Sequence, residues 1–150
     1  MKIFALLAIV FSTSAAFASC PNFNGNFKYV SETTKMKLVA KQTKCKSLDF
    51  TYNYANGQVL GKIYALDGVR RNTFENNELV VYESAAFVDG YIRATVEDYY
   101  KATKITKSAL VYYRIDDKGD LVSQVDYINE HGTITKTTLA QFTRIPGISD

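Results

Sequence analysis

The sequence has very few of the residues on which most enzyme and metal sites depend. Its 150 residues include one histidine, two cysteines and no tryptophan. His131 stands between Glu130 and Gly132 with no nucleophile or companion ligand nearby, so it is expected to be an exposed turn residue. Phosphate-binding loops, zinc-protease helices, nucleophile elbows and dinucleotide fingerprints are absent. The sequence therefore predicts a non-enzymatic protein with no catalytic residue, no metal and no cofactor.

Strong charge is also missing, and only one long apolar run is present. The net charge of +3 is too small to indicate a nucleic-acid partner. The apolar run, Ile3–Phe11, follows Met1-Lys2 and precedes Ala16-Phe17-Ala18, which is the pattern of a secretory signal peptide. It is too short to span a bilayer as a mature helix. The sequence predicts a signal peptide over residues 1–18 and a single exported domain over 19–150, in the periplasm or outside the cell, without a transmembrane segment.

Both cysteines lie in the predicted mature chain. An exported protein meets an oxidising compartment, in which a pair such as Cys20 and Cys45 is normally joined. A Cys20–Cys45 disulfide is therefore expected. The alternative is that Phe17-Ala18-Ser19-Cys20 is a lipoprotein-type cleavage site, with the mature chain anchored through a lipid on Cys20.

The clearest local pattern is a hairpin over residues 48–66. Leu48, Phe50, Tyr52 and Tyr54 alternate with polar residues, which is the period of a strand with one buried face. Asn56-Gly57 follows, and Asn-Gly between two alternating runs is a strong hairpin signal because both residues tolerate positive φ. We expect the aromatic side chains of this strand to point into the core.

Similar runs continue to the end of the chain, separated by turn residues such as Asp89-Gly90 and Gly119. Residues 91–104 fit both helical and strand spacing, and the preceding Asp-Gly together with β-branched residues favours a strand. Evenly spaced runs with short connections favour an antiparallel up-and-down meander. The predicted fold is all-β, a closed barrel of about 8–9 strands, since closure removes exposed edges. A two-sheet β-sandwich is the alternative.

Two groups of acidic residues are candidates for a calcium site or a catalytic carboxylate pair. Asp116, Asp117 and Asp120 surround a turn and could suggest calcium, but the EF-hand spacing is absent and a plain turn is expected. Glu83 and Glu97-Asp98 could form a carboxylate pair for glycosidic chemistry, although solvated charge is their expected role.

Gly25-Asn26-Phe27, just ahead of a predicted first strand, together with successive hairpins and an N-terminal disulfide, resembles the lipocalin and wider calycin-like barrels. The lipocalin motif has Trp where this chain has Phe27. The resemblance implies a barrel that encloses small apolar molecules. The Cys20-Pro21 start is similar to that of small exported proteins of Gram-negative bacteria, which implies location only.

The leading functional hypothesis is a binding barrel for a small, partly apolar ligand. The chain has eleven tyrosines, whose rings are apolar and whose hydroxyls can orient a ligand. The candidate ligand-binding residues are Phe50, Tyr52, Tyr54, Val81, Phe87, Val111 and Tyr113. The alternative is a surface interaction module with a dry core, in which a lysine-rich outer face, including Lys35, Lys37 and Lys41, contacts an envelope component or another protein.

Overall fold

A computed structural model describes residues 20–147 of the chain, and these residues form ten β-strands and no helix. Among them there is consequently no helix that could cross a membrane. The predicted all-β class is confirmed. The strands are β1 (Gly25–Val30), β2 (Lys35–Thr43), β3 (Ser47–Tyr54), β4 (Val59–Ala65), β5 (Arg71–Glu75), β6 (Leu79–Val88), β7 (Tyr91–Tyr100), β8 (Ile105–Ile115), β9 (Leu121–Ile128) and β10 (Ile134–Arg144). The signal peptide expected over residues 1–18 lies outside the described residues.

The strands form one antiparallel sheet in the order β4-β3-β2-β1-β10-β9-β8-β7-β6-β5. All pairs except β1–β10 join neighbours along the chain, as an up-and-down meander requires. The predicted closure is not seen, because β4 and β5 are the two ends of the sheet and do not pair. The linker between them is bonded to β6 instead: Gly68 N donates to Ala85 O at 2.8 Å, and Asp67 forms a bridge with Ala86. The barrel is therefore open between β4 on one side and β5 and β6 on the other.

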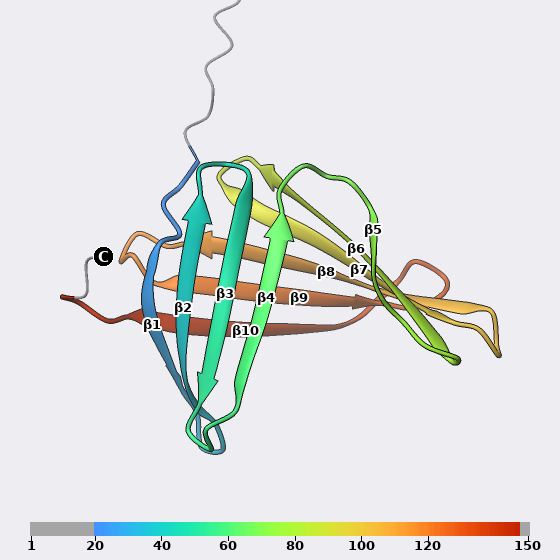
Figure 1. Ribbon diagram of the computed structural model, residues 1–150, viewed down its shortest axis with the longest axis horizontal. Helices are drawn as coiled ribbons and strands as arrows, with labels where there is room; N and C mark the ends of the chain where they lie inside the picture. The colour runs from blue at the N-terminus through green and yellow to red at the C-terminus, as the bar shows by residue number, and fades with distance from the viewer. Residues whose placement is uncertain (1–19, 148–150) are drawn as a thin grey trace, which may run out of the picture.

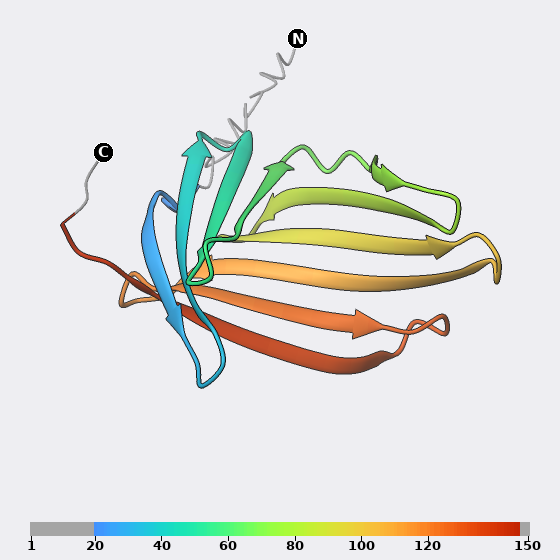
Figure 2. The same ribbon diagram turned by 60° about the horizontal axis from the view of Figure 1, so that its bottom comes forward.

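The sheet folds over into two layers. Strands β1–β4 run steeply across the long strands β6–β10 in Figure 1, and Figure 2 shows the long strands extending well past the short ones. The layers are joined at the β1–β10 pair, which has only two register positions, Phe27↔Arg144 and Lys28↔Thr143. This short junction lets the two layers cross at a large angle.

The core lies between the layers and is filled by residues that alternate along the strands. Leu48 and Phe50 on β3 are fully buried, and Tyr52 packs against the same cluster. This confirms the inward face predicted for the strand. The other fully buried large side chains are Phe23, Phe27, Leu38, Ile92 and Leu121. Each contributes about 1.5–3 kcal/mol of hydrophobic stabilisation relative to an exposed side chain.

The Asp89-Gly90 turn has positive φ at both positions, as expected, whereas in Asn56-Gly57 only Gly57 has positive φ and the connection from β3 to β4 takes four residues, 55–58. Gly57 has φ of 86°, and Asp89 and Gly90 have φ of 46° and 88°. Residues 91–100 form strand β7, which pairs along its length with β6 and from Ile92 onward with β8, and residues 101–104 form a turn. The segment is therefore a strand and not a helix, because its backbone groups bond to strands on both sides.

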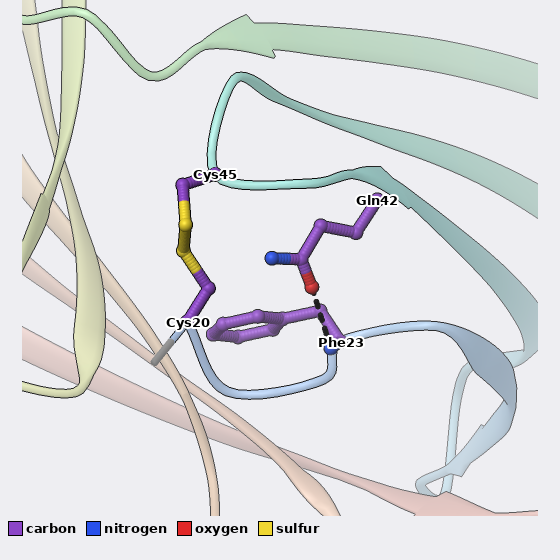
Figure 3. Close-up of a disulfide and its surroundings, with 4 residues drawn as sticks. All are labelled: Cys20, Phe23, Gln42 and Cys45. Carbon is purple, nitrogen blue, oxygen red and sulfur yellow. Dashed lines mark hydrogen bonds between the residues drawn. A yellow bond between two sulfur atoms is a disulfide. The ribbon is translucent and has the colours of Figure 1, made fainter. Parts of the chain in front are cut away.

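The segment before β1 is attached to the β2–β3 connection. Cys20 and Cys45 form the predicted disulfide, with a Cα–Cα distance of 5.8 Å (Figure 3). Phe23 is fully buried, and its backbone N–H donates to Gln42 Oε1 at 2.9 Å. The ring of Phe23 thus covers one end of the core, held in place by a covalent bond and a hydrogen bond.

Arg144 near the end of β10 contacts both the start of β1 and the β8–β9 turn. No sequence pattern indicated this role. Its guanidinium carbon lies 4.7 Å from the centre of the Phe27 ring. Its Nη1 donates to Asn24 O and its Nε donates to Gly119 O, each at 2.8 Å. The Arg144 side chain, on β10, therefore links the segment that precedes β1 to the turn between β8 and β9.

Candidate functional site

Three of the predicted ligand-binding residues pack against one another inside the barrel. The ring centres of Phe50 and Tyr113 are 4.8 Å apart, and those of Phe50 and Tyr52 are 6.0 Å apart. Val111 belongs to the same buried cluster, and Phe87 packs against it. The structure therefore brings together five of the seven predicted residues around one aromatic centre.

Tyr64 on β4 completes this centre, although it was not among the predicted ligand-binding residues. Its hydroxyl lies 3.3 Å from that of Tyr113, within hydrogen-bond distance. Burial raises the pKa of Tyr64 from 10.0 to about 12, and burial likewise raises the pKa of Tyr52 and of Tyr113 well above its ordinary value. These phenols stay protonated at neutral pH, so they can donate or accept hydrogen bonds but do not act as phenolate nucleophiles.

An ion pair between Lys62 on β4 and Glu83 on β6 adjoins the aromatic centre. The side chain of Glu83 is 13% exposed and that of Lys62 is 33% exposed. Glu83 pairs in register with Val96, whereas Glu97 pairs with Tyr82, so the two glutamates lie on opposite faces of the sheet. Glu97 binds Arg70 on its own face at 2.5 Å. These two carboxylates therefore do not form the pair that glycosidic chemistry would need.

A small pocket of about 140 Å³ lies at the opening between β4 and β6. Tyr64 and Glu83 line it from the strands, and Arg71 lines it from β5. Arg71 Nη2 binds Asp67 Oδ2 at 2.6 Å, which lowers the pKa of that carboxyl. The pocket is well below the volume of about 300–1,000 Å³ that is usual for small-molecule sites.

A larger pocket of about 460 Å³ lies at the tips of the β1–β2 and β3–β4 hairpins. We call it the hairpin-tip pocket. The two tips are joined by a hydrogen bond from Ala55 N to Lys35 O, at 3.1 Å. Its lining residues are Lys28, Tyr29, Val30, Lys35, Met36, Lys37, Asn53, Tyr54 and Ala55.

The hairpin-tip pocket unites residues from both functional hypotheses. Tyr54 comes from the predicted ligand-binding set, and Lys35 and Lys37 come from the predicted lysine-rich face. Lys41 lies on the same exposed face of β2 but outside the pocket, opposite Asp49 in register. Val81, the remaining predicted ligand residue, is half-buried on β6 and does not line this pocket.

His131 and Asp116, which the sequence offered as weak candidates for catalysis or metal binding, lie in or beside turns. The His131 side chain is 78% exposed. Asp116 Oδ1 accepts backbone hydrogen bonds from Lys118 and Asp120, both at 2.9 Å, so this carboxylate stabilises the turn. Within residues 20–147 no group of three or more His, Cys, Asp or Glu side chains is arranged to hold a metal ion.

Comparisons with known proteins identify the architecture. No protein-family model and no curated protein sequence matches the chain. Among solved structures, wild-type fluorescent protein UnaG is 12% identical and superposes with a TM-score of 0.57, over 82% of this chain and 97% of UnaG. Fatty-acid-binding protein 1 of Echinococcus granulosus is 10% identical, with a TM-score of 0.57 over 82% of this chain and 97% of its own. Human cRBP IV is 9% identical, with a TM-score of 0.53 over 83% and 98%. The chain thus has a calycin-like β-barrel architecture, the fold of these proteins.

Proposed function

We propose that this chain is an exported, non-enzymatic binding protein that takes a small, partly apolar molecule in the hairpin-tip pocket. The observation that carries the proposal is the pocket itself. Its volume of about 460 Å³ lies within the usual range for small-molecule sites, and the pocket at the β4–β6 opening is too small. The export signal and the destination, periplasm or cell exterior, are part of the proposal.

The lining of the pocket suits such a ligand. Met36 and Tyr54 face each other in register on β2 and β3, and Tyr29 pairs with Met36 from β1. Tyr29 and Met36 also pack against the buried core. A ligand here would bury apolar surface at about 25 cal/mol per Å² and would find the Tyr54 hydroxyl and the lysines at the rim.

Along β3 the pocket leads to the predicted ligand-binding residues. Tyr54, Tyr52 and Phe50 share one face of the strand because side chains alternate. In the proposal, Tyr54 contacts the ligand directly, and Tyr52 is the neighbouring residue on the same face of β3. Phe50, Val111 and Tyr113 belong to the core cluster, Phe87 packs against it, and Val81 lies on β6; none of these five lines the pocket itself. In the proposal they support the pocket and do not contact the ligand.

The solved structures of the same fold support the proposal by analogy. One of them is named a fatty-acid-binding protein. A shared fold alone does not assign function, whereas the pocket and its lining are features of this chain itself.

Uptake of Nile red, a neutral apolar fluorophore, tests the proposal. The unmodified protein should enhance its fluorescence saturably, and native mass spectrometry should show one bound molecule. Tyr54→Asp places a charge in the pocket and should abolish uptake. Thr51→Asp is the matched control, because residue 51 lies on the same strand but faces outward. No uptake by the unmodified protein, or equal loss in both variants, would refute the proposal.

A second candidate function rests on the outer face of the short layer. Lys28 and Lys37 lie directly opposite each other on β1 and β2, where like charges repel. Among the described residues, neither these lysines nor Lys35 and Lys41 take part in an ion pair. We propose as the alternative that this face contacts an anionic envelope component. Reversing Lys41, which lies on this face but outside the pocket, to Glu should then weaken cosedimentation with phosphatidylglycerol vesicles while Nile red uptake continues. Reversing Lys35 and Lys37 as well should abolish cosedimentation.

A further inference from the structure

A second groove lies on the outer face of the long layer, on the side of the sheet away from the core. It has a volume of about 290 Å³ and is formed by β7, β8, β9 and β10. We call it the outer groove. The residues used below are Tyr91, Tyr112, Arg114, Gln124, Asp126 and Leu139. Neither functional hypothesis from the sequence included any of them.

The base of the outer groove contains a buried carboxylate. Asp126 on β9 is only 6% exposed. It accepts a hydrogen bond from Thr137 Oγ1 at 2.7 Å, and Gln124 Nε2 lies 3.0 Å from each of its oxygens. An ionised carboxylate can only accept hydrogen bonds, so the amide group of Gln124 must turn its NH₂ toward Asp126.

This contact fixes the other half of the Gln124 amide. With its nitrogen held by Asp126, the carbonyl oxygen Oε1 points away from the carboxylate. No group of the described residues donates to Oε1. The groove thus presents a hydrogen-bond acceptor whose direction is set by a buried charge, rather than by a mobile surface side chain.

The walls of the groove are apolar. Tyr112 and Leu139 flank Gln124 in register, from β8 and β10. The rings of Tyr91 and Tyr112 lie 5.8 Å apart at an interplanar angle of 58°. Leu139 is 70% exposed, which is high for a large aliphatic side chain on a strand. Two aromatic rings and an aliphatic side chain therefore stand on either side of a polar floor.

Hydrogen-bond donors complete the groove. Arg114 lies on the same face of β8 as Tyr112, and within the described chain it forms no ion pair. Its guanidinium provides several donors, and the two tyrosine hydroxyls can donate or accept. Arg114 and Asp126 contribute opposite charges, so the groove has no strong preference for an anion.

We propose that the outer groove binds a saccharide. A sugar ring has C–H faces that stack on aromatic rings, and its neighbouring hydroxyls both donate and accept hydrogen bonds. Gln124 Oε1 would accept from one hydroxyl and Arg114 would donate to another, while Tyr91 and Tyr112 contact the ring. A purely apolar ligand would leave the ordered amide and guanidinium without partners, which is costly once water is displaced.

Calorimetric titration of the mature protein with maltohexaose, cellohexaose, chitohexaose and mannohexaose tests the proposal. At least one of these probes should bind. Tyr91→Ala should then weaken its affinity by about tenfold or more. Gln124→Met, which keeps the size of the side chain and removes the acceptor, should also weaken binding. Tyr99→Ala is the matched control, since Tyr99 lies on the same strand and face but outside the groove.

Thermal unfolding and Nile red uptake are measured for each variant as controls. If Tyr91→Ala does not fold, Gln124→Met provides the test. The proposal is overturned if none of the four oligosaccharides binds at millimolar concentration, or if the Tyr99 control loses as much affinity as the groove variants. Nile red uptake should be unchanged throughout, so failure of this site and failure of the hairpin-tip pocket are distinguishable.

Discussion

Lys62 on β4 and Glu83 on β6 form an ion pair that connects the two sides of the barrel opening. The pair adjoins the ring of Tyr64, since Lys62 Nζ lies 5.3 Å from the centre of that ring. No backbone pairing joins β4 to β5, so this edge depends on the backbone bonds of the linker to β6 and on side-chain contacts. The ion pair partly replaces the strand pairing that would close the barrel.

Removing one partner of this pair should destabilise the fold. Glu83→Gln leaves the Lys62 charge beside apolar side chains without its counterion. The free energy of unfolding should fall by about 1–3 kcal/mol, below the cost for a fully buried pair because Lys62 is partly exposed. Urea denaturation at neutral pH measures it. The double variant Lys62→Met with Glu83→Gln should lose less than the sum of the two single losses, and additive losses would contradict the coupling.

The buried tyrosines should make stability fall at high pH. Burial raises the pKa of Tyr64 to about 12 in the folded chain, from 10.0. Below pH 10 both folded and unfolded chains keep this proton, so it contributes no pH dependence. Above pH 10 the unfolded chain releases the proton first, so the free energy of unfolding decreases as pH rises toward 12.

Absorbance of phenolate during an alkaline titration measures this effect. Tyr52, Tyr64 and Tyr113 should ionise only together with unfolding, because burial raises the pKa of each. The variant Tyr64→Phe should reduce the steepness of the stability loss. Reversible ionisation of all eleven tyrosines in the folded protein would contradict the burial described here.

Loss of the Cys20–Cys45 disulfide should weaken the fold. The bond joins residues separated by 25 positions, and a closed loop of this length stabilises a domain by about 3 kcal/mol in the chain-entropy model. The double variant Cys20→Ser with Cys45→Ser should therefore unfold at lower urea concentration than the oxidised protein. Reducing agent should shift the original protein in the same direction and leave the variant unchanged.

The intact mass of the purified protein checks the same bond. A mass lower by two hydrogens than that of the reduced chain is expected. A diacylglycerol-sized increment on Cys20 would instead support the lipid-anchored alternative.

Gly25→Ala should disturb the attachment made by Arg144. Gly25 has φ of 153°, and a Cβ at this position would collide with Arg144 Nη1. Backbone strain at this positive φ and displacement of the guanidinium, which holds Asn24 O and Gly119 O, should together cost about 1–3 kcal/mol in the free energy of unfolding. Gly61→Ala is the control: a Cβ there meets no atom within 4 Å, so its urea midpoint should change little. Equal effects would contradict the role of Arg144.

Strand positions and core direction could be predicted from local sequence. Phe50 and Tyr52 alternate with polar residues, and Asn56-Gly57 and Asp89-Gly90 restrict the backbone to a few turn types, so neighbouring residues carry the information. The exposed strand β5 was not counted as a separate strand. All five of its residues are exposed, so it has no alternating pattern to detect.

The sites depended on contacts between residues distant in sequence. Tyr54 was among the predicted ligand-binding residues and Lys35 was placed on the lysine-rich face, yet both line one pocket because two hairpin tips meet. The outer groove also combines residues distant in sequence. Tyr112 on β8 and Leu139 on β10 lie on either side of Gln124 on β9.

Local sequence predicts the class of structure and the hairpins, because alternation and turn residues are local properties, and it makes a disulfide between the two cysteines the expected state with a lipid anchor on Cys20 as the alternative. Where the sheet stays open, and which side chains meet across that opening, follow from long-range packing that no local pattern encodes. Lys62 and Glu83 belong to strands that are not hydrogen-bonded to each other, so their meeting follows from the folding over of the two layers rather than from any spacing along the chain.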